Sequence, residues 1–219
     1  MKTIAIVQAR VSSVRFPKKI LKKILGKTII ELLVERLLKS KLINTVVVAI
    51  PKNKDNSALK ELLLKKKYNI FLGSENDLLD RYYQCAKSLD ADNVVRITSD
   101  CPLADPLLID KMIKSFIDSN IDCLSNVNPP TFPDGLDVSI CTFKALEIAW
   151  KNAKSTFDRE HVMPYIYNSE KFNTKNYINN EDLSKSRWTV DYKEDFILIK
   201  KIFEYFSPRS DFSWIEVKN

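Results

Sequence analysis

The sequence predicts an α/β protein with a mostly parallel sheet that is covered by helices on both faces. Two observations lead to this prediction. Short apolar runs rich in β-branched residues alternate with amphipathic stretches along the first half of the chain, and several of those stretches begin with helix-capping residues. The apolar runs also show little alternation of apolar and polar residues, which is typical of strands buried on both faces.

The first half of the chain is predicted to alternate between strands and helices. Strands are expected at residues 3–8, 45–50, 69–72 and 93–98, and helices at residues 29–38, 56–67, 78–89 and 106–120. Thr28 and Glu31 have the spacing of a capping box before the first helix, and Ser74 and Asp77 have that spacing before the third. Pro51 is expected to end the second strand because proline lacks the backbone N–H that a strand ladder needs.

The second half of the chain is less regular. Strands are expected at residues 121–126, 137–143, 171–178 and 186–190, and helices at residues 144–152, 158–168 and 193–206. A turn-rich segment separates the first two of these strands, and Pro164 is expected to break or kink the middle helix. No repeat or low-complexity linker divides the chain, so residues 1–219 are predicted to form a single domain.

The composition excludes a mainly disordered chain. Hydrophobic residues make up 45% of the sequence and charged residues 29%, which is enough apolar surface to offset the ordering entropy of a globular fold. The formal net charge is +7, but the lysines are spread over several predicted helix faces rather than gathered in one basic block. We therefore expect no nucleic-acid partner.

The cysteines and the N-terminal residues indicate a cytoplasmic protein. The four cysteines lie far apart, none forms a Cys-x-x-Cys pair, and the chain has a single histidine, so neither a zinc site nor a disulfide framework is expected. The apolar run at the N-terminus is too short for a secretory signal or a membrane span.

Glycine is unusually rare. At a typical usage of roughly 7% a chain of this length would contain about 15 glycines, whereas this one has three, Gly26, Gly73 and Gly135. Each is therefore expected at a place where the backbone has no room for a side chain or must turn.

A basic loop follows the first predicted strand. Within residues 8–19 it carries four cationic and two hydroxyl side chains, Arg10, Arg15, Lys18, Lys19, Ser12 and Ser13. Guanidinium forks, ammonium groups and hydroxyls are the donors that a triphosphate requires, and ligands bind at the carboxyl ends of strands in open α/β sheets. The residues alone leave two interpretations open, a phosphate site and a solvated basic loop.

Six segments in chain order carry a resemblance to a known family. They are residues 8–19, 71–83, 96–102, 133–138, 159–165 and 187–191. These segments resemble the CTP-using sugar-acid cytidylyltransferases, which include the CMP-Kdo and acylneuraminate enzymes, and especially the spore-coat polysaccharide branch. The resemblance implies a three-layer α/β/α nucleotidyltransferase fold of the glycosyltransferase-A type. It also implies an enzyme that transfers CMP from CTP to a sugar acid or a related surface-polysaccharide precursor and releases pyrophosphate.

The resemblance further implies that four residues carry the reaction. Arg10 and Lys19 would hold the triphosphate, and Asp100 and Asp191 would bind the Mg²⁺ that bridges it. Each aspartate follows an apolar strand, so both can project from one edge of the sheet, and Mg²⁺ prefers one or two carboxylates together with phosphate oxygens. The residues alone leave a second interpretation, in which both aspartates are helix N-caps.

Contacts to the two substrates are also implied by the resemblance. The implied CTP contacts are Ala9, Arg10, Ser13, Arg15, Lys19, Ser74, Asp77 and Arg81. The implied acceptor contacts are Asp134, Gly135, Asp137, Arg159, Glu160, His161 and Tyr165. Structural alternatives exist for some of them, because Arg81 can pair with Asp77 or Asp80 along one helix and His161 can be a structural hydrogen-bonding residue.

Three positions depart from the pattern of the family. Lys18 and Ser99 stand where the family often has glycine, and Ser139 stands where an acidic residue is common. The first two changes keep the charged groups of the implied site, whereas Ser139 concerns the sugar side. The same architecture also suits a transferase that uses a finished nucleotide sugar, a phosphonate cytidylyltransferase, or a catalytically silent nucleotide-binding subunit.

The resemblance also gives an organisation to the single domain. Residues 1–120 are expected to form the nucleotide-binding half, and residues 121–180 an acceptor-side elaboration and dimer region. We expect a homodimer that binds CTP and a small acidic or phosphorylated acceptor, with Mg²⁺ as cofactor and without a nucleic-acid or membrane partner.

Overall fold

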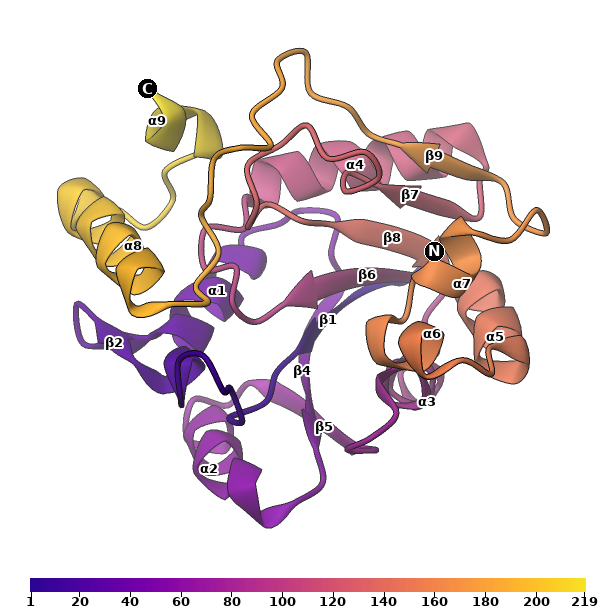
Figure 1. The fold of residues 1–219 in the computed structure, drawn as a ribbon, viewed down its shortest axis with the longest axis horizontal. Coiled ribbons are helices and arrows are strands. Elements are labelled where there is room, and N and C mark those ends of the chain that lie inside the picture. The colour runs from indigo at the N-terminus through magenta and orange to yellow at the C-terminus, as the bar shows by residue number, and fades with distance from the viewer.

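The computed structural model describes residues 1–219 as a seven-stranded sheet with helices on both faces (Figure 1). The strands are β1 (Thr3–Gln8), β4 (Thr45–Pro51), β5 (Asn69–Gly73), β6 (Asn93–Thr98), β7 (Cys123–Ser125), β8 (Ser139–Thr142) and β9 (Thr174–Asn176). Their order in the sheet is β5-β4-β1-β6-β8-β7-β9. Only β8 runs antiparallel to its neighbours, β6 and β7, so the prediction of a mostly parallel sheet is confirmed.

Nine α-helices connect and cover the strands. They are α1 (Ile29–Leu37), α2 (Ser57–Lys65), α3 (Leu78–Ser88), α4 (Pro106–Ser119), α5 (Phe143–Asn152), α6 (Thr156–His161), α7 (Pro164–Tyr167), α8 (Lys193–Phe206) and α9 (Trp214–Lys218). Two 3-10 turns, η1 (Lys19–Leu21) and η2 (Lys54–Asn56), and a small hairpin of β2 (Lys23–Ile24) and β3 (Lys27–Thr28) complete the fold. No helix is long and apolar enough to cross a membrane.

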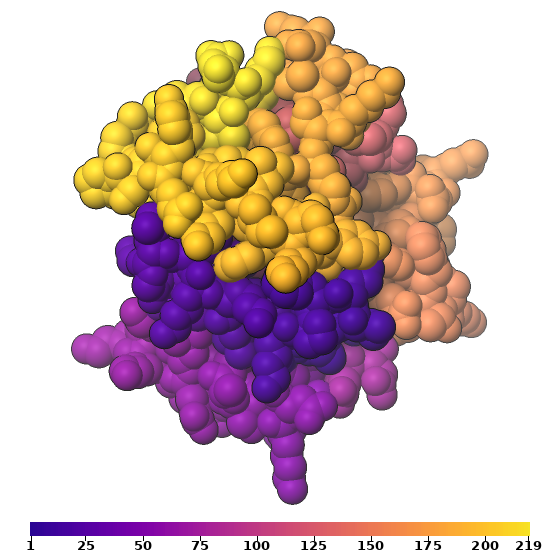
Figure 2. Space-filling view, turned by 60° about the vertical axis from the view of Figure 1, so that its left-hand side comes forward, coloured from indigo at the N-terminus to yellow at the C-terminus, as the bar shows by residue number.

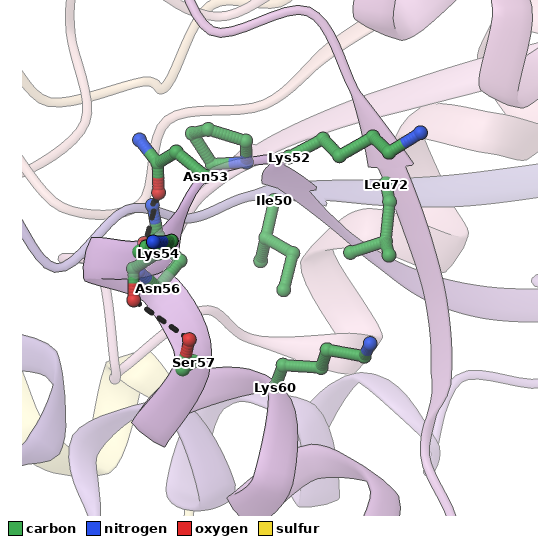
Figure 3. Close-up of a pocket in the computed structure, with 9 residues that line it drawn as sticks. Ile50, Lys52, Asn53, Lys54, Asn56, Ser57, Lys60 and Leu72 are labelled. Carbon is green, nitrogen blue, oxygen red and sulfur yellow. Dashed lines mark hydrogen bonds between the residues drawn. The ribbon is translucent and has the colours of Figure 1, made fainter.

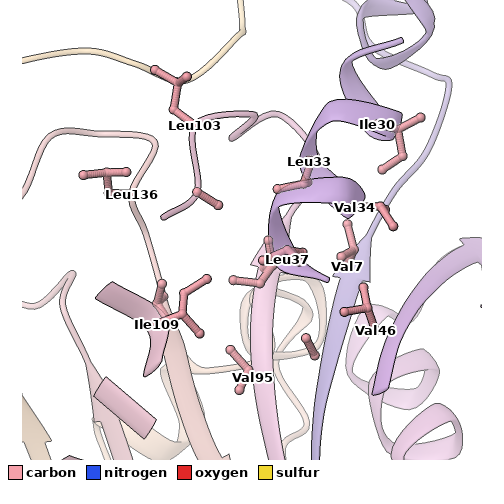
Figure 4. Packing of buried hydrophobic residues seen from close by; sticks show 14 of the residues in the cluster. Val7, Ile30, Leu33, Val34, Leu37, Val46, Val95, Leu103, Ile109 and Leu136 are labelled. Carbon is pink, nitrogen blue, oxygen red and sulfur yellow. The ribbon is translucent and has the colours of Figure 1, made fainter. Parts of the chain in front are cut away.

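The two faces of the sheet bury separate hydrophobic clusters. Helices α1, α2, α4 and α8 pack on one face and α3, α5 and α7 on the other. Figure 4 shows α1 lying over the sheet, with Leu33 and Leu37 directed toward strand residues such as Val7 and Val95. Leu33 and Leu37 are fully buried, and burial of a leucine side chain contributes about 1.5–3 kcal/mol.

Most predicted elements of the first half are present within one or two residues of their expected ends. Strands β1 and β6 match residues 3–8 and 93–98, and α8 in the second half matches residues 193–206. The predicted capping box of α1 is also confirmed, because Thr28 Oγ1 accepts the N–H of Glu31 while the Glu31 carboxylate accepts the N–H of Thr28.

One prediction for the second half is confirmed and one is wrong. The helix expected at residues 158–168 is broken near Pro164, as predicted, into two short helices, α6 and α7, because Val162 between them has a positive φ of 71° and Pro164 begins a new helix. The strand expected at residues 186–190 does not exist. Residues 188–190 are buried, but the backbone of the segment bonds to loops rather than to a strand: Trp188 N–H to the carbonyl of Asp134, and Val190 N–H to the carbonyl of Asp100.

Gly135 explains how the segment at residues 186–190 comes so close to the loop before β8. Its φ is 110°, and a Cβ atom there would lie 2.5 Å from the backbone carbon of Trp188. Any side chain would therefore push the two segments apart. Because the same contact orders residues 187–191, this glycine helps to position Asp191.

The C-terminal segment packs against the N-terminal one, although they are far apart in sequence. Figure 2 shows the C-terminal residues, in yellow, directly over the first residues of the chain, in indigo. The buried Arg36 of α1 fixes this arrangement, because its guanidinium donates to the carbonyls of Leu103, Ala104, Ser210 and Phe212. These carbonyls lie in the segments that follow Asp100 and α8, so one side chain ties both to α1.

Candidate active site

A cleft of about 1020 Å³ opens at the carboxyl ends of β1 and β6. Its walls come from the loop after β1, the start of α3, the end of β6, the helix α6 and Asp191. Six of the residues expected to contact CTP line this cleft: Ala9, Arg10, Ser13, Arg15, Lys19 and Arg81. The basic loop thus lies at a cavity.

Lys19 joins the two aspartates expected to bind a metal. Its Nζ atom is 2.7 Å from Oδ2 of Asp100 and 2.7 Å from Oδ1 of Asp191, and Arg15 Nη2 lies 2.9 Å from the same Asp191 oxygen. Burial acts to lower the pKa of Lys19, but the two carboxylates outweigh it and raise this pKa. Burial acts to raise the pKa of Asp191, but hydrogen bonds from Lys19 and Arg187 outweigh it and lower this pKa.

Neither aspartate caps a helix, which answers the alternative left open by the sequence. The N-cap of α4 is Asp105, whose carboxylate accepts the N–H groups of Leu107 and Leu108. At the start of α8 the carboxylate of Asp195 accepts the backbone N–H groups of Asp191 and Tyr192. The side chains of Asp100 and Asp191 therefore face the cleft rather than a helix terminus.

The two carboxylates offer the donor set that Mg²⁺ prefers. Their oxygens bind one cation together, so they lie close enough to share another, and carboxylate oxygens are hard ligands. No group of three or more histidine, cysteine, aspartate or glutamate side chains forms a metal site by itself. Mg²⁺ commonly takes one or two carboxylates and completes its shell with phosphate oxygens and water, so Asp100 and Asp191 fit this metal.

Arg187 is a site residue that the sequence argument did not single out. Its guanidinium bonds Asp134 at 2.9 Å, Asp191 at 3.0 Å and Asp195 at 3.1 Å. It therefore orients one of the two metal-type carboxylates and links it to the acceptor-side loop. The available signal was its position in the segment 187–191, four residues before Asp191.

Arg81 is buried beside the cleft without an internal partner. Its side chain is 4% exposed, and neither Nε nor Nη1 has a hydrogen-bond partner, so it does not pair with Asp77 or Asp80. Burial lowers its pKa. A Cβ atom on Gly73 would come within 2.8 Å of Arg81 Cγ, which explains the glycine there. Unpaired buried guanidinium donors are costly, so these donors are available to a ligand or a bound water molecule.

Ser74, Asp77 and Arg159 are engaged within the protein. Asp77 is the N-cap of α3, and Ser74 Oγ accepts its N–H. The Asp77 carboxylate also pairs with Arg159 Nε at 2.6 Å. Arg159 donates further to the carbonyls of Trp150 and Ala153 at the end of α5. These three residues thus join α3, α5 and α6 and brace one wall of the cleft.

The remaining acceptor residues fall into two groups. Glu160 and His161 are exposed on α6 and line the cleft, whereas Tyr165 is not among its lining residues and packs against Phe172. Asp134 and Asp137 lie on the opposite side of the site, in the loop before β8. Burial and the neighbouring Asp134 charge raise the pKa of Asp137 to about 6.

A second cavity of about 340 Å³ lies next to the basic loop, between β4, β5 and α2 (Figure 3). Figure 3 shows Ile50 and Leu72 on its floor and the bond between Asn53 and Asn56 at its rim. The buried Asn56 accepts the N–H of Val11 at 2.9 Å. It thereby holds the basic loop where that loop leaves β1.

Comparisons with known proteins agree with this geometry. A family model described as Cytidylyltransferase matches residues 4–207. The uncharacterized protein MJ1063 of Methanocaldococcus jannaschii is 40% identical over 209 residues, which cover 94% of this chain and 85% of that one. The spore coat polysaccharide biosynthesis protein SpsF of Bacillus subtilis is 28% identical over 226 residues, which cover 97% and 90%.

A solved structure shows the same fold. A cytidylyltransferase from Leptospira borgpetersenii is 36% identical in sequence and superposes with a TM-score of 0.94. The match covers 100% of this chain and 92% of that one. The sequence match and the shared fold, together with a cleft that joins a basic loop to two carboxylates, lead to one conclusion. The chain belongs to the cytidylyltransferase family.

Proposed function

We propose that this protein transfers CMP from CTP to a hydroxyl group of a sugar acid, or of a related acidic precursor of a surface polysaccharide, and releases pyrophosphate with Mg²⁺ as cofactor. The observation that carries the proposal is the convergence of Asp100 and Asp191 on Lys19, next to Arg15. A pair of carboxylates beside several phosphate-binding cations suits a triphosphate with its bridging metal.

The reaction forms one bond to the α-phosphorus and breaks another. The acceptor oxygen bonds to the α-phosphorus, its proton leaves to solvent, and the bond to the bridging oxygen breaks to release pyrophosphate. Asp100 and Asp191 would hold the Mg²⁺, which when bound neutralises charge on the phosphate oxygens. Positioning and electrostatics carry such reactions, so no side-chain nucleophile is required.

The cations of the basic loop supply the electrostatics of this proposal. Lys19 neutralises both carboxylates in the free protein. If Asp100 and Asp191 held Mg²⁺, the Lys19 ammonium would be available to bind phosphate oxygens. Arg10 is exposed at the cleft and makes no ion pair within the protein, so its guanidinium is free to bind the triphosphate. Arg81 is proposed to contact the nucleotide because its buried donors lack internal partners.

The experiment that tests the proposal is a pyrophosphate-release assay in Mg²⁺. It crosses the four nucleoside triphosphates with sugar acids, sugar phosphates, phosphonates and neutral sugars. We expect turnover with CTP and an acidic acceptor, and none after chelation of the metal. Equal turnover with all four triphosphates, or full activity in excess chelator, would contradict the proposal. Glycosyl transfer from a finished nucleotide sugar without pyrophosphate release would replace it by a glycosyltransferase.

A further inference from the structure

Arg96 of β6 is a second guanidinium that lacks an internal partner. Its Nε atom is buried and has no hydrogen-bond partner within the protein. The arginines that form ion pairs are Arg15, Arg159, Arg187 and Arg209, so Arg96 is not among them. Burying such donors unpaired is costly, and native proteins rarely leave them so. The side chain retains partial exposure, so a molecule from solvent can reach it.

The position of Arg96 connects it to the cleft. Side chains alternate along a strand, so Arg96 points to the same face of β6 as Thr98, whose side chain lines the cleft, while Val95 and Ile97 enter the opposite core cluster. Arg96 itself is not among the residues that line the cleft, and β6 ends at Thr98, two residues before Asp100. Arg96 thus lies on the strand that leads to the cleft, on the face of the sheet that carries Thr98.

The groups around Arg96 do not satisfy it. Burial raises the pKa values of Asp137, Tyr82 and Tyr167, and the charge of Arg96 opposes the rise in each, so the three groups lie within electrostatic range of Arg96. The tyrosines are already bonded elsewhere, Tyr167 to Ser139 Oγ at 2.6 Å and Tyr82 to the carbonyl of Ile6 at 3.0 Å. Their hydroxyl groups are therefore not dedicated to Arg96.

Ser139 leaves the guanidinium of Arg96 without a charged partner on β8. In the antiparallel pairing of β6 and β8 it stands directly opposite Arg96, where side chains lie close together on one face. An acidic residue at position 139 would neutralise the guanidinium from within the protein. Serine is short and neutral, so the charge of Arg96 is left for a ligand.

We infer that Arg96 binds the anionic oxyacid group of the acceptor, a carboxylate or a phosphonate, and thereby selects acidic acceptors. This inference rests on the proposed function. Both oxyacids present oxygens that a guanidinium fork binds with paired charge-assisted hydrogen bonds. A neutral acceptor of the same shape would leave Arg96 buried and unpaired, which is a strong basis for discrimination.

The kinetic test compares Arg96→Gln, Arg96→Lys and Ser139→Glu with the wild type, using 3-deoxy-manno-octulosonate and 2-hydroxyethylphosphonate as acceptors, each of which has a hydroxyl group as well as an oxyacid group. For the acid that the wild type uses, Arg96→Gln should raise the KM at least tenfold and leave the KM for CTP within twofold. Arg96→Lys should restore part of the loss, and Ser139→Glu should raise the same KM because its carboxylate occupies the guanidinium. Arg209→Gln, which removes an exposed charge from the C-terminal segment, should behave as wild type.

Two kinetic results would contradict the inference. An unchanged acceptor KM in Arg96→Gln, or an equal rise of the KM values for CTP and for the acceptor, would show that Arg96 does not bind the acceptor. Thermal melts of each variant accompany the assay, so that a variant that unfolds is recognised.

A binding measurement on the wild type keeps the inference testable without turnover. The NMR signal of the Arg96 Nε–H group, assigned by its absence in Arg96→Lys, is followed while each of the two acids is added in the presence of Mg²⁺ and a CTP analogue whose α,β-bridging oxygen is replaced by a methylene group, so that no transfer occurs. A saturable shift with either acid supports the inference, and the acid that causes it identifies carboxylate or phosphonate. No shift with either acid overturns it. Because this readout needs no reaction, it separates failure of the inference from failure of the proposed function.

Discussion

The cations on the two sides of the cleft are held in different ways. On the nucleotide side, Lys19 and Arg15 are ion-paired to carboxylates at 2.7–2.9 Å. At the acceptor side and at the buried wall, Arg96 and Arg81 have donors without any partner. The first group has its charges neutralised within the protein. The second group has donors that no group of the protein satisfies, so they are free to bind a ligand or water.

The largest expected effect is on the carboxylates that organise the nucleotide side. Asp100→Asn and Asp191→Asn keep the side-chain shape and remove the charge, so each should lower kcat by about a hundredfold or more. Pyrophosphate release measured against Mg²⁺ concentration checks this, with a circular-dichroism melt as the folding control.

The matched control for these variants is Asp118→Asn, an exposed aspartate on α4. It should be indistinguishable from the wild type. Normal turnover of both cleft variants would remove the metal site from the proposal. Normal turnover of Asp191→Asn alone would leave Asp100 and the phosphates as the metal ligands.

The next effect compares Lys19, which is ion-paired within the protein, with Arg10, which is not. Lys19→Ala and Arg10→Ala should each weaken CTP binding by about 1.5–3 kcal/mol, the usual contribution of a hydrogen bond to a charged group. Only Lys19→Ala should also change stability, because it leaves two carboxylates facing each other without a counter-ion. Calorimetry with CTP and thermal melts of the two variants measure both quantities. Equal melting temperatures would show that the Lys19 ion pairs contribute nothing to the free protein.

The sequence predicted the elements with strong local signals. Strand β6 and helix α8 were predicted to the residue, because an apolar β-branched run and a regular helical pattern determine them locally. The convergence of Asp100 and Asp191 required the family resemblance, since the two segments meet through loop contacts such as the bond from Val190 N–H to the carbonyl of Asp100. The segment at residues 186–190 is apolar like a strand, but its backbone partners are loops whose positions the local sequence does not encode.

The site residues show the same division. The basic loop could be recognised from its residue types, and the structure places it at a cleft. The unpaired state of Arg96 could not be recognised, because a missing partner is a property of everything around a side chain. Its one sequence signal was Ser139, where the family often carries an acid, and the register of β6 and β8 gives that change a physical meaning.

A smaller effect concerns the acceptor side and depends on pH. The folded-state pKa of Asp137 is raised to about 6 from an ordinary value of 3.8, so the protein favours the protonated form. The resulting cost to stability is fully present above pH 6 and is relieved as the pH falls from 6 to 4. Asp137→Asn should therefore stabilise the free protein by about 1–3 kcal/mol at pH 7 and by little at pH 4.

Chemical denaturation at pH 4, 5, 6, 7 and 8 measures this difference. Asp118→Asn is again the control and should follow the pH dependence of the wild type. A stabilisation by Asp137→Asn that does not vary with pH would show that removal of the carboxylate acts through packing rather than through its ionisation.

The smallest expected effect tests whether the KM for CTP can be raised while the KM for the acceptor stays the same. Asn56 lies 2% exposed and accepts the N–H of Val11, which is itself buried. Asn56→Leu keeps the branching at Cγ but leaves that N–H unpaired, which should cost about 1–3 kcal/mol of stability. Because Val11 follows Arg10 in the basic loop, we expect the KM for CTP to rise several-fold and the KM for the acceptor to stay unchanged. Asn56→Asp keeps an oxygen acceptor at this position and should retain most of the CTP affinity. If Asn56→Leu instead raised the acceptor KM as well, the two sides of the cleft would be mechanically coupled. The two sides would then differ in how their cations are paired, but they would not move independently of each other.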